Sequence, residues 1–532
     1  MNARPGVDIV IVGAGFAGLY MLHKARQSGF SARIFEAASG VGGTWYWNRY
    51  PGARCDVESM EYSYQFSEEL QQEWRWTERY ASQPEILRYL NHVADRFGLR
   101  EGIRFDTRVT AAVFDEATAH WLVRTASGEQ VSARFVVMAT GCLSSTNLPA
   151  FKGAETFAGE TFHTGRWPHE AVDFSGKRVG VIGTGSSAVQ SIPLIAQQAK
   201  TLVVFQRTAT YSVPARNGPL EAAYESRIKA DYAGFRARNS RMLNAFGSGT
   251  PRNETSAFDA SPAERARAFE ARWRQGGLVF LGAFGDLILN PAANETAAEF
   301  VRAKIRSIVH DPEVARLLEP KQAIGCKRLC LDSGYFETFN RPNVRLVDVN
   351  QAPIEALTPK GLRAGGVEHE LDSIIFATGF DAMTGALQRI DIRGRGGRAL
   401  QKAWSAGPLN YLGLSVAGFP NLFIISGPGS PSVLTNMAVS IEQHVNWIAG
   451  CIAYLRAQGH ASIEASAGAE HGWVGHVNAV ANRTVYPACN SWYLGANVPG
   501  KTRVFMPLLG FPPYVEKCDE VAAGGYEGFV LS

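Results

Sequence analysis

This chain contains two glycine-rich turns, and their spacing indicates chemistry more clearly than that of any other residues. Each turn stands between an apolar run and a helical pattern. The first is Gly13-Ala-Gly15-Phe-Ala-Gly18, which follows the apolar run 7–12. In such a turn the first glycine allows a tight turn, the second lets the backbone approach a pyrophosphate, and the third lets the helix pack on the strand. Glu36 ends the next apolar run, where the hydroxyl pair of a ribose needs an acceptor. The sequence therefore predicts a dinucleotide site at Gly13, Gly15, Gly18 and Glu36.

The second turn is Gly183-Thr184-Gly185-Ser186-Ser187-Ala188, and alanine in its last place is a variation that the pattern allows. Where the first site has Glu36, the chain here has Gln206, followed by Arg207 and Thr208. A guanidinium and a hydroxyl at this point suit the 2′-phosphate of NADP, whereas an acid would favour NAD. The alternative is an ordinary exposed arginine. We expect this turn and Arg207-Thr208 to bind NADP.

Charged residues and aromatic loops supply the remaining candidates. The loop 42–56 mixes glycines such as Gly43 with aromatics such as Trp45, which suits a loop that wraps a flat ring system; a small aromatic core is the alternative. Asp56, at its end, would need a cationic partner if it is buried. Lys327 and Arg328 are adjacent cations that enter an apolar run, and a solvated pair is the alternative. The loop 491–501 is expected to be a mobile cover over a pocket, or else a static surface loop.

The elements that must position these residues follow an α/β pattern with two Rossmann-like dinucleotide-binding domains. We expect the first domain to comprise residues 1–142, the second 143–379 with a helical insertion at about 217–318, and 380–532 to rejoin the first. The sequence Ala-Thr-Gly ends a strand-like run in both halves, at 139–141 and at 377–379. Residues 62–98 are predicted to be largely helical, and capping boxes are predicted at Ser82 and at Ser261.

Composition narrows the class of protein. A chain of 532 residues with a formal charge of +4 gives no reason to expect nucleic acid as a partner. Its 7 cysteines are scattered and odd in number, so no disulfide framework is expected, and Cys326 and Cys330 are too far apart for a C-x-x-C metal or redox pair. No stretch resembles a signal peptide or a membrane span. These features predict a soluble cytoplasmic protein in a reducing compartment, without a metal and without membrane attachment.

A connector between the two halves carries a more specific pattern. Phe157, Gly159, His163, Trp167 and Pro168 stand at the spacing F-x-G-x-x-x-H-T-x-x-W-P, for which an ordinary interdomain linker is the alternative. With the glycine turns on either side, the pattern resembles the fingerprint of the single-chain Baeyer–Villiger monooxygenases that use FAD and NADPH. The stretches 42–56, 427–431 and 491–500 strengthen this resemblance, especially to members that act on aryl ketones and steroids.

The resemblance implies an activity. NADPH would reduce FAD, O2 would form a flavin peroxide, and this would convert a hydrophobic aryl or polycyclic ketone to an ester or lactone. Arg328 matches the arginine that steadies the negative charge, Asp56 matches the carboxylate that holds this arginine beside the cofactors, and His163 is expected to act in domain motion. The matching cofactor contacts are, for FAD, Tyr62, Val109 and Met437, and, for NADP, Lys327, Arg207, Thr208 and Trp492. The expected partners are a small ketone and O2, and the expected state is a monomer.

Three other functions remain open at this point. An N- or S-oxygenating flavin monooxygenase shares both glycine turns, but its linker fingerprint lacks the Trp167-Pro168 ending. A nucleotide-binding redox sensor would bind the same cofactors without turnover. A dithiol reductase would need a close pair of redox cysteines, which the spacing does not provide.

Overall fold

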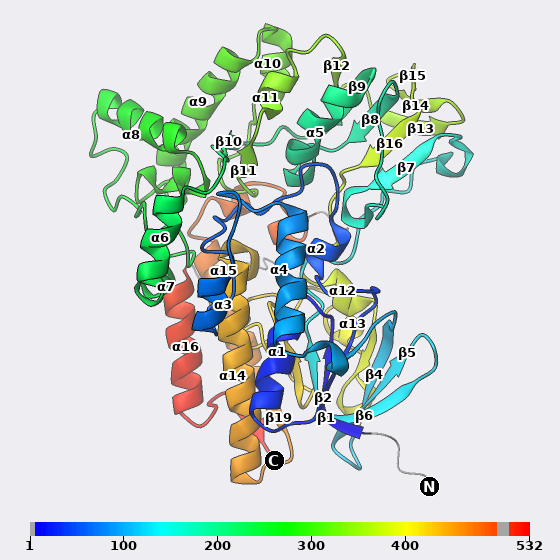
Figure 1. Ribbon diagram of the computed structural model, residues 1–532, viewed down its shortest axis with the longest axis vertical. Coiled ribbons are helices and arrows are strands. Elements are labelled where there is room, and N and C mark those ends of the chain that lie inside the picture. The colour runs from blue at the N-terminus through cyan, green and yellow to red at the C-terminus, as the bar shows by residue number, and fades with distance from the viewer. Residues whose placement is uncertain (1–5, 497–509) are drawn as a thin grey trace.

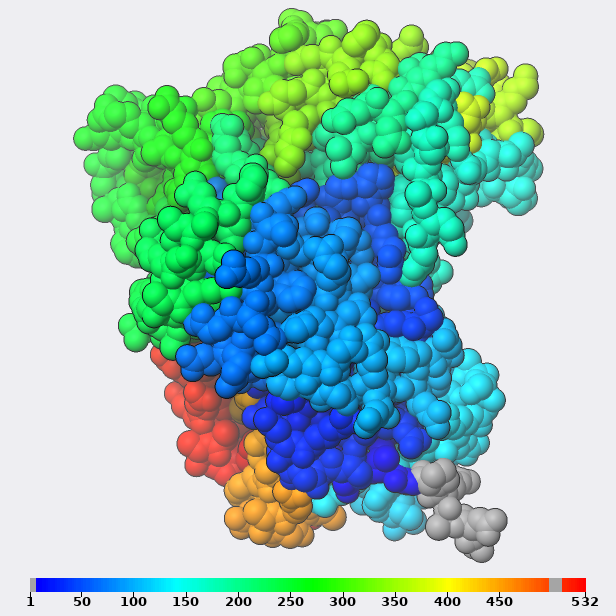
Figure 2. All heavy atoms as spheres, in the orientation of Figure 1, coloured from blue at the N-terminus to red at the C-terminus, as the bar shows by residue number. Residues whose placement is uncertain are grey.

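Two mainly parallel sheets with helices on their faces form the frame of the molecule (Figure 1). The computed structural model describes residues 6–496 and 510–532. Figure 2 shows how the unit built on the first sheet lies below, with the second sheet and the inserted helices above it. The predicted fold class, two Rossmann-like units with a helical insertion, is confirmed.

The first sheet has the strand order β17-β4-β5-β6-β1-β2-β3, with β18 also paired to β6. Because alternate side chains of β1 point to opposite faces, Ile9 and Ile11 join the core under α1 and α14, while Val10 and Val12 join the core on the other face. The bounds are β1 Gly6–Val12, α1 Phe16–Gln27, β2 Ala32–Phe35, β3 Ile103–Arg104, β4 Val109–Asp115, β5 His120–Thr125, β6 Gln130–Met138, β17 Asp391–Arg393, β18 Leu422–Ile424 and α14 Met437–Gln458.

The second sheet has the order β12-β9-β8-β16-β7, and every pairing in it is parallel. Its strands all lie between residues 160 and 376, whereas β17 and β18 belong to the first sheet. This order is compatible with the expected crossings near 143 and 379, although the domain limits themselves stay predictions. The bounds are β7 Glu160–His163, β8 Arg178–Ile182, α5 Ser186–Gln198, β9 Thr201–Gln206, β12 Val344–Asp348 and β16 Ser373–Phe376.

The helical insertion touches both units. Phe269 and Val301 pack into the core that contains β8 and β9, whereas Ile228 and Phe235 pack into the core under α1 and α14. The predicted capping box at Ser261 is present, because its hydroxyl accepts from the Glu264 N–H while the Glu264 carboxylate accepts from the Ser261 N–H. The helices are α6 Ala222–Ala230, α7 Tyr232–Ser240, α8 Pro262–Gln275, α9 Pro291–Ile308 and α10 Pro312–Leu318.

Two local predictions are right only in part. Within residues 62–98, the helices are α3 (Glu68–Glu73) and α4 (Gln83–Arg96). Ser82 is the N-cap of α4, as predicted, but the capping box is absent: Ser82 makes no capping hydrogen bond, and the Glu85 carboxylate accepts from the Thr77 N–H at 2.8 Å. A tertiary contact therefore replaces the local one.

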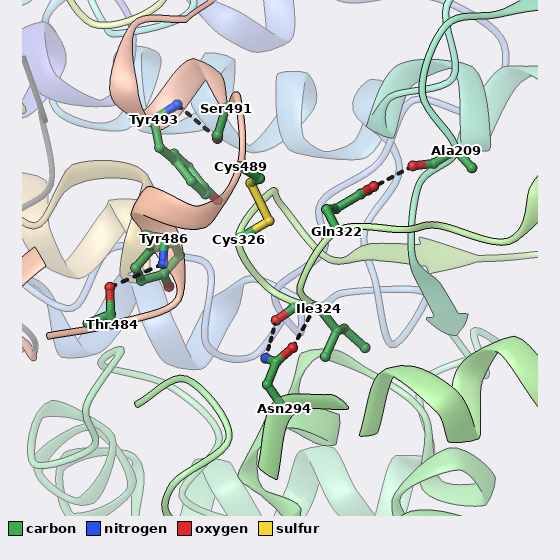
Figure 3. The surroundings of a disulfide bond; sticks show 10 residues. All are labelled: Ala209, Asn294, Gln322, Ile324, Cys326, Thr484, Tyr486, Cys489, Ser491 and Tyr493. Carbon is green, nitrogen blue, oxygen red and sulfur yellow. Dashed lines mark hydrogen bonds between the residues drawn. A yellow bond between two sulfur atoms is a disulfide. The ribbon is translucent and has the colours of Figure 1, made fainter. Parts of the chain in front are cut away.

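The cysteine prediction also needs correction. Cys326 and Cys489 form a disulfide across 163 residues of sequence, with their Cα atoms 6.3 Å apart (Figure 3). The other five cysteines are free and buried. Sequence spacing could not reveal the pair because tertiary packing alone brings the two segments together. A reducing compartment is therefore no longer supported by the cysteines, and the cytoplasmic location stays a prediction.

Within the described ranges, no helix is long and apolar enough to cross a membrane. The same residues contain no group of three or more His, Cys, Asp or Glu side chains able to hold a metal ion.

A first prediction concerns the third glycine of the first turn. A Cβ at Gly18 would overlap the carbonyl oxygen of Gly13, whereas α5 already has Ala188 at the matching place. Gly18→Ala should therefore push α1 off β1 and weaken the binding of the expected FAD by about tenfold or more. Flavin content and FAD titration of the apoprotein measure this. Ala188→Gly is the matched control and should retain FAD; equal FAD affinity in Gly18→Ala and the parent protein would contradict the packing argument.

Candidate active site

The first glycine turn leaves room for a ligand backbone and for little else. Gly13 has φ +107°, and a Cβ there would stand 2.6 Å from the carbonyl oxygen of Ala139. A Cβ on Gly15 would meet the Cα of Gly43, at the start of the aromatic loop, at 3.3 Å. The turn then opens into α1, whose first N–H groups are free to bind phosphate oxygens. These features fit a pyrophosphate between the two glycine segments.

Glu36 fixes this turn as well as facing the expected ribose. Its carboxylate accepts from the N–H of Ala14 at 2.6 Å and from the N–H of Ala38 at 2.7 Å. Burial raises the pKa of Glu36, while these two N–H groups oppose the rise. Each carboxylate oxygen keeps a further lone pair, so the ribose hydroxyls can still donate to it.

The aromatic loop and Tyr62 lie beside the first glycine turn, and two further predicted FAD contacts, Val109 and Met437, belong to the same unit. Trp45, in α2 (Thr44–Trp47), donates its indole N–H to the Tyr62 hydroxyl at 3.2 Å, and Tyr62 packs edge-on against Phe16 of α1. Val109 is the first, buried residue of β4. Met437 begins α14 and, like Trp492, packs against the buried cluster that contains Cys142. The loop therefore supplies buried aromatic side chains beside the first glycine turn, while a direct flavin contact stays a prediction.

The second glycine turn repeats the first. Gly183 has φ +111°, and a Cβ there would overlap the carbonyl of Ala377, just as Gly13 lies against Ala139. The repeated Ala-Thr-Gly segments therefore lie beside the first glycine of each turn. Thr184 donates to the carbonyl of Thr208 at 2.7 Å, and Ser187, in the first turn of α5, donates to the Thr164 hydroxyl at 3.1 Å. Ser186 contacts the thiol of Cys330 at 3.2 Å, and the N-cap of α5 is Gly185.

Arg207 and Lys327 are brought together although 120 residues separate them. The pKa of Lys327 is lowered, first by burial and then by the positive charge of Arg207. Neither cation has a carboxylate partner among the described residues. Gln206 is buried and donates to the carbonyl of Leu317 at 2.7 Å, so it does not compete for this position. Two unneutralised cations beside the second turn fit the 2′-phosphate of NADP.

Arg328 and Asp56 form a bidentate ion pair between the two units. Arg328 Nε and Nη2 donate to the two Asp56 oxygens at 2.9 and 2.7 Å, and Nη1 donates to the carbonyl of Val433 at 2.8 Å. Strand β11 (Cys330–Asp332), which pairs in parallel with β10 (Ser212–Pro214), holds the arginine on the side of the second unit. The cost of burial is outweighed by Asp56, with help from Tyr493, so the pKa of Arg328 is raised and the group stays positive.

The fingerprint residues lie where the chain passes between the two sheets. His163, the last residue of β7, lies 3.4 Å from the carbonyl of Asn147 and 3.4 Å from the Thr378 hydroxyl, so it touches both crossing segments. Its Nδ1 accepts from the Gly165 N–H, and burial lowers the pKa of His163. A neutral ring with both nitrogens occupied suits a structural joint.

The other fingerprint residues pack the same joint. Phe157 joins the core behind β9 and β16, and a Cβ on Gly159 would overlap the carbonyl of Asp372. Trp167 is buried and stacks on Phe162. Its backbone N–H donates to the backbone carbonyl of Trp47 in the first unit at 3.3 Å. Pro168, which follows it, is half-buried.

Residues 489–494 contain Trp492 and two further site residues, Cys489 and Tyr493, that the sequence did not predict. Trp492 lies in η8 (Trp492–Leu494), where it packs with Val433 and Met437. Tyr493, its neighbour, is within hydrogen-bonding contact of Arg328. Cys489 joins Cys326, two residues before Arg328. Residues 497–501 of the predicted cover lie outside the described residues.

Two phosphate-binding turns on two sheets, with a fixed cation between them, define a flavoprotein oxidoreductase that passes electrons between bound dinucleotides. The family model for pyridine nucleotide-disulphide oxidoreductases matches residues 10–234. A Baeyer–Villiger monooxygenase from Pseudooceanicola batsensis is 46% identical over 98% of this chain and 96% of its own. The chain belongs to the family of Baeyer–Villiger monooxygenases, which are flavoprotein enzymes that use FAD and NADPH.

Two further relatives bear on the chemistry. A solved structure of oxidised steroid monooxygenase bound to NADP is 55% identical, with a TM-score of 0.94 over 99% of both chains. A phenazine N-monooxygenase from Lysobacter antibioticus is 43% identical over 100% of this chain and 98% of its own. Proteins that are similar to this chain over nearly their whole lengths are thus named for different oxygen acceptors, a steroid and a phenazine nitrogen.

A second prediction concerns the choice of coenzyme. Arg207→Ala removes one of two cations beside the expected 2′-phosphate, which should cost about 1.5–3 kcal/mol of NADPH binding. NADH lacks this phosphate, so its binding should change little. Titration of the variant and of the parent protein with each coenzyme measures the two binding affinities. An equal loss for NADPH and NADH would show that Arg207 does not contact the 2′-phosphate.

Proposed function

We propose that this enzyme converts hydrophobic ketones, aryl-substituted or polycyclic, to esters or lactones, with Arg328 as the catalytic cation and Asp56 as the residue that holds it. When bound, FAD supplies the chemistry, because it takes a hydride from NADPH and then activates O2 for transfer to the ketone. The side chains of this enzyme bind the cofactors, orient the substrate and stabilise negative charge.

The observation that carries the proposal is the bidentate pair of Arg328 with Asp56. A carboxylate that binds one edge of a guanidinium fixes the plane of the whole group. Negative charge that develops on a substrate oxygen then meets a half-buried cation that needs no reorganisation. Because the pKa of Arg328 is raised, the group also cannot lose its charge at any working pH.

An apolar cluster beside this cation supports a hydrophobic substrate. Arg328 donates to the carbonyl of Val433, whose side chain belongs to that cluster. Apolar side chains beside the cation favour a substrate whose carbonyl is its main polar group. The similarity to a steroid monooxygenase supports polycyclic ketones in particular. The members of the cluster are Cys142, Leu143, Ala382, Met383, Val433, Met437 and Trp492.

N-oxygenation is the second candidate, because the phenazine N-monooxygenase shares 43% of its residues with this chain. An aromatic nitrogen attacks activated oxygen as a nucleophile and forms no tetrahedral adduct on carbon. Such a reaction therefore depends less on a cation beside a substrate oxygen. A sensor without turnover is not favoured, since the family consists of enzymes.

A third prediction tests the class of substrate. With NADPH and ¹⁸O2, a panel of phenyl ketones, steroid ketones, cyclohexanone and phenazine should give esters or lactones from the larger ketones, each with one ¹⁸O atom. Mass spectrometry of the products measures this. Exclusive formation of phenazine N-oxide would favour the second candidate, and reduction of ketones to alcohols would contradict both.

A fourth prediction separates oxygenation from reduction of the flavin. Arg328→Ala should still bind FAD and be reduced by NADPH, but should form about 10²–10³-fold less ester, because it lacks the donor aimed at the developing charge. The O2 that it consumes should appear as H2O2. Asp56→Ala should show a milder loss, because the arginine is loosened and not removed.

Arg302→Ala is the matched control for this experiment. Arg302 is also largely buried and pairs with Glu295 and Glu299, but it lies on α9 away from both glycine turns. It should keep a normal ratio of ester to H2O2. Normal ester formation in Arg328→Ala would place the catalytic cation elsewhere.

A further inference from the structure

Residues 489–494 are attached to the catalytic arginine at two points. The disulfide joins Cys489 to Cys326, which precedes Lys327 and Arg328 in sequence. Four residues after Cys489, the buried side chain of Tyr493 lies within reach of the positive charge of Arg328. Val433, whose carbonyl accepts from Arg328, packs against the same small cluster as Tyr493. Figure 3 shows the disulfide with Ser491 and Tyr493 on the same short segment. The covalent bond and this contact thus connect the same two stretches of chain.

The phenol of Tyr493 is held in a defined place. Ser491, which is buried, accepts from the Tyr493 N–H at 3.1 Å and so caps the turn η8. The Tyr493 ring is 4% exposed and packs edge-on against Tyr486, with ring centroids 5.8 Å apart. Burial raises the pKa of Tyr493 to about 12, against a lowering by Arg328, so the phenol is neutral. A neutral phenol accepts from the guanidinium without cancelling its charge.

The other end of the disulfide is anchored in the second unit. Asn294 of α9 accepts from the Ile324 N–H at 2.9 Å and donates to the Ile324 carbonyl at 2.8 Å. Gln322 donates to the carbonyl of Ala209 at 2.8 Å, and Cys326 is fully buried. The segment before Arg328 therefore has a fixed position, and the disulfide transmits this position to residues 489–494.

The contacts of Arg328 come from three directions. Asp56 holds one edge, the carbonyl of Val433 accepts from Nη1, and Tyr493 contacts the group from residues 489–494. Asp56 fixes the plane of the guanidinium, and the third contact comes from a segment that is tied covalently to the arginine's own stretch of chain. This third contact adds to the restraint on the arginine.

We infer that Tyr493 is a positioning residue for Arg328 and that the Cys326–Cys489 disulfide maintains their contact. This inference rests on the catalytic role proposed for Arg328. A dithiol would open the bond: its thiolate attacks the half-exposed Cys489 sulfur, the Cys326 thiolate leaves, and the second dithiol sulfur releases Cys489. The protein gains two electrons and two protons as two thiols, and the dithiol becomes a cyclic disulfide. Oxygenation then becomes less well coupled to NADPH use.

The Tyr493→Phe variant tests the first part. It should lower the ratio of ester to H2O2 about threefold to tenfold, the range that one lost hydrogen bond produces, while the rate constant for flavin reduction by NADPH stays unchanged. Tyr211→Phe is the matched control, because the Tyr211 hydroxyl also accepts from an arginine at 3.1 Å, but from Arg302 and not from Arg328. Unchanged coupling in Tyr493→Phe, or an equal loss in Tyr211→Phe, would overturn the inference.

The parent enzyme treated with a dithiol, and the variant Cys489→Ser, test the second part. Alkylation of the denatured protein, followed by mass measurement, should show five free thiols before reduction and seven after it. Both samples should show the coupling loss of Tyr493→Phe, and neither should add to it when combined with that variant. Cys451→Ser, which replaces a buried free thiol, should keep normal coupling. Seven thiols before reduction, or full coupling in the reduced enzyme, would overturn the role of the disulfide.

The catalytic role of Arg328 and the positioning role of Tyr493 can be tested separately. If Arg328→Ala forms ester normally, the proposed function of the arginine is wrong, and the inference falls with it. If Arg328→Ala releases H2O2 but Tyr493→Phe does not, the proposed function stands and only the positioning role is wrong.

Discussion

The ion pair between Arg328 and Asp56 is the interaction on which the rest of the site depends. Its two residues are 272 positions apart in sequence, and each comes from a different unit of the fold. A buried ion pair adds little net stability, because both charges must leave water, but removal of one partner leaves an uncompensated charge. The value of the pair is therefore geometric: it places one fixed cation between two dinucleotide sites only when both units are packed correctly.

The surrounding structure serves that packing. The loop that ends in Asp56 lies on α5, where the Tyr50 hydroxyl donates to the Gln190 side chain at 2.8 Å. In the connector, the backbone N–H of Trp167 donates to the backbone carbonyl of Trp47, and His163 contacts both segments that cross between the units. The fingerprint residues thus pack where the chain passes between the two units. Their part in domain motion stays a prediction.

The sequence was most informative where backbone geometry demands a particular residue. Gly13 and Gly183 stand where a side chain cannot fit, and the lost acid at 206 pointed to Arg207 as a phosphate contact. Lys327, now found near Arg207, was assigned to NADP only through the resemblance. The pairing of Asp56 with Arg328 was predicted from the resemblance. The residues alone predicted only that a buried Asp56 would need some cationic partner.

Other features depend on contacts that no local pattern records. The capping box at Ser82 is absent because Glu85 bonds to Thr77, although the same pattern succeeded at the exposed Ser261. The disulfide joins segments 163 residues apart, and the same packing brings Tyr493 beside Arg328. Both required the packed structure, because sequence spacing says nothing about which distant loops meet.

The central claim is that Asp56 acts on the reaction only through Arg328. A double-mutant cycle measures this directly, with ester formed per NADPH consumed in Asp56→Ala, Arg328→Ala and the double variant. The account predicts that the double variant is no worse than Arg328→Ala alone, because a missing arginine can no longer be displaced. A loss in the double variant equal to the product of the two single losses would show that Asp56 works independently, and would contradict the account.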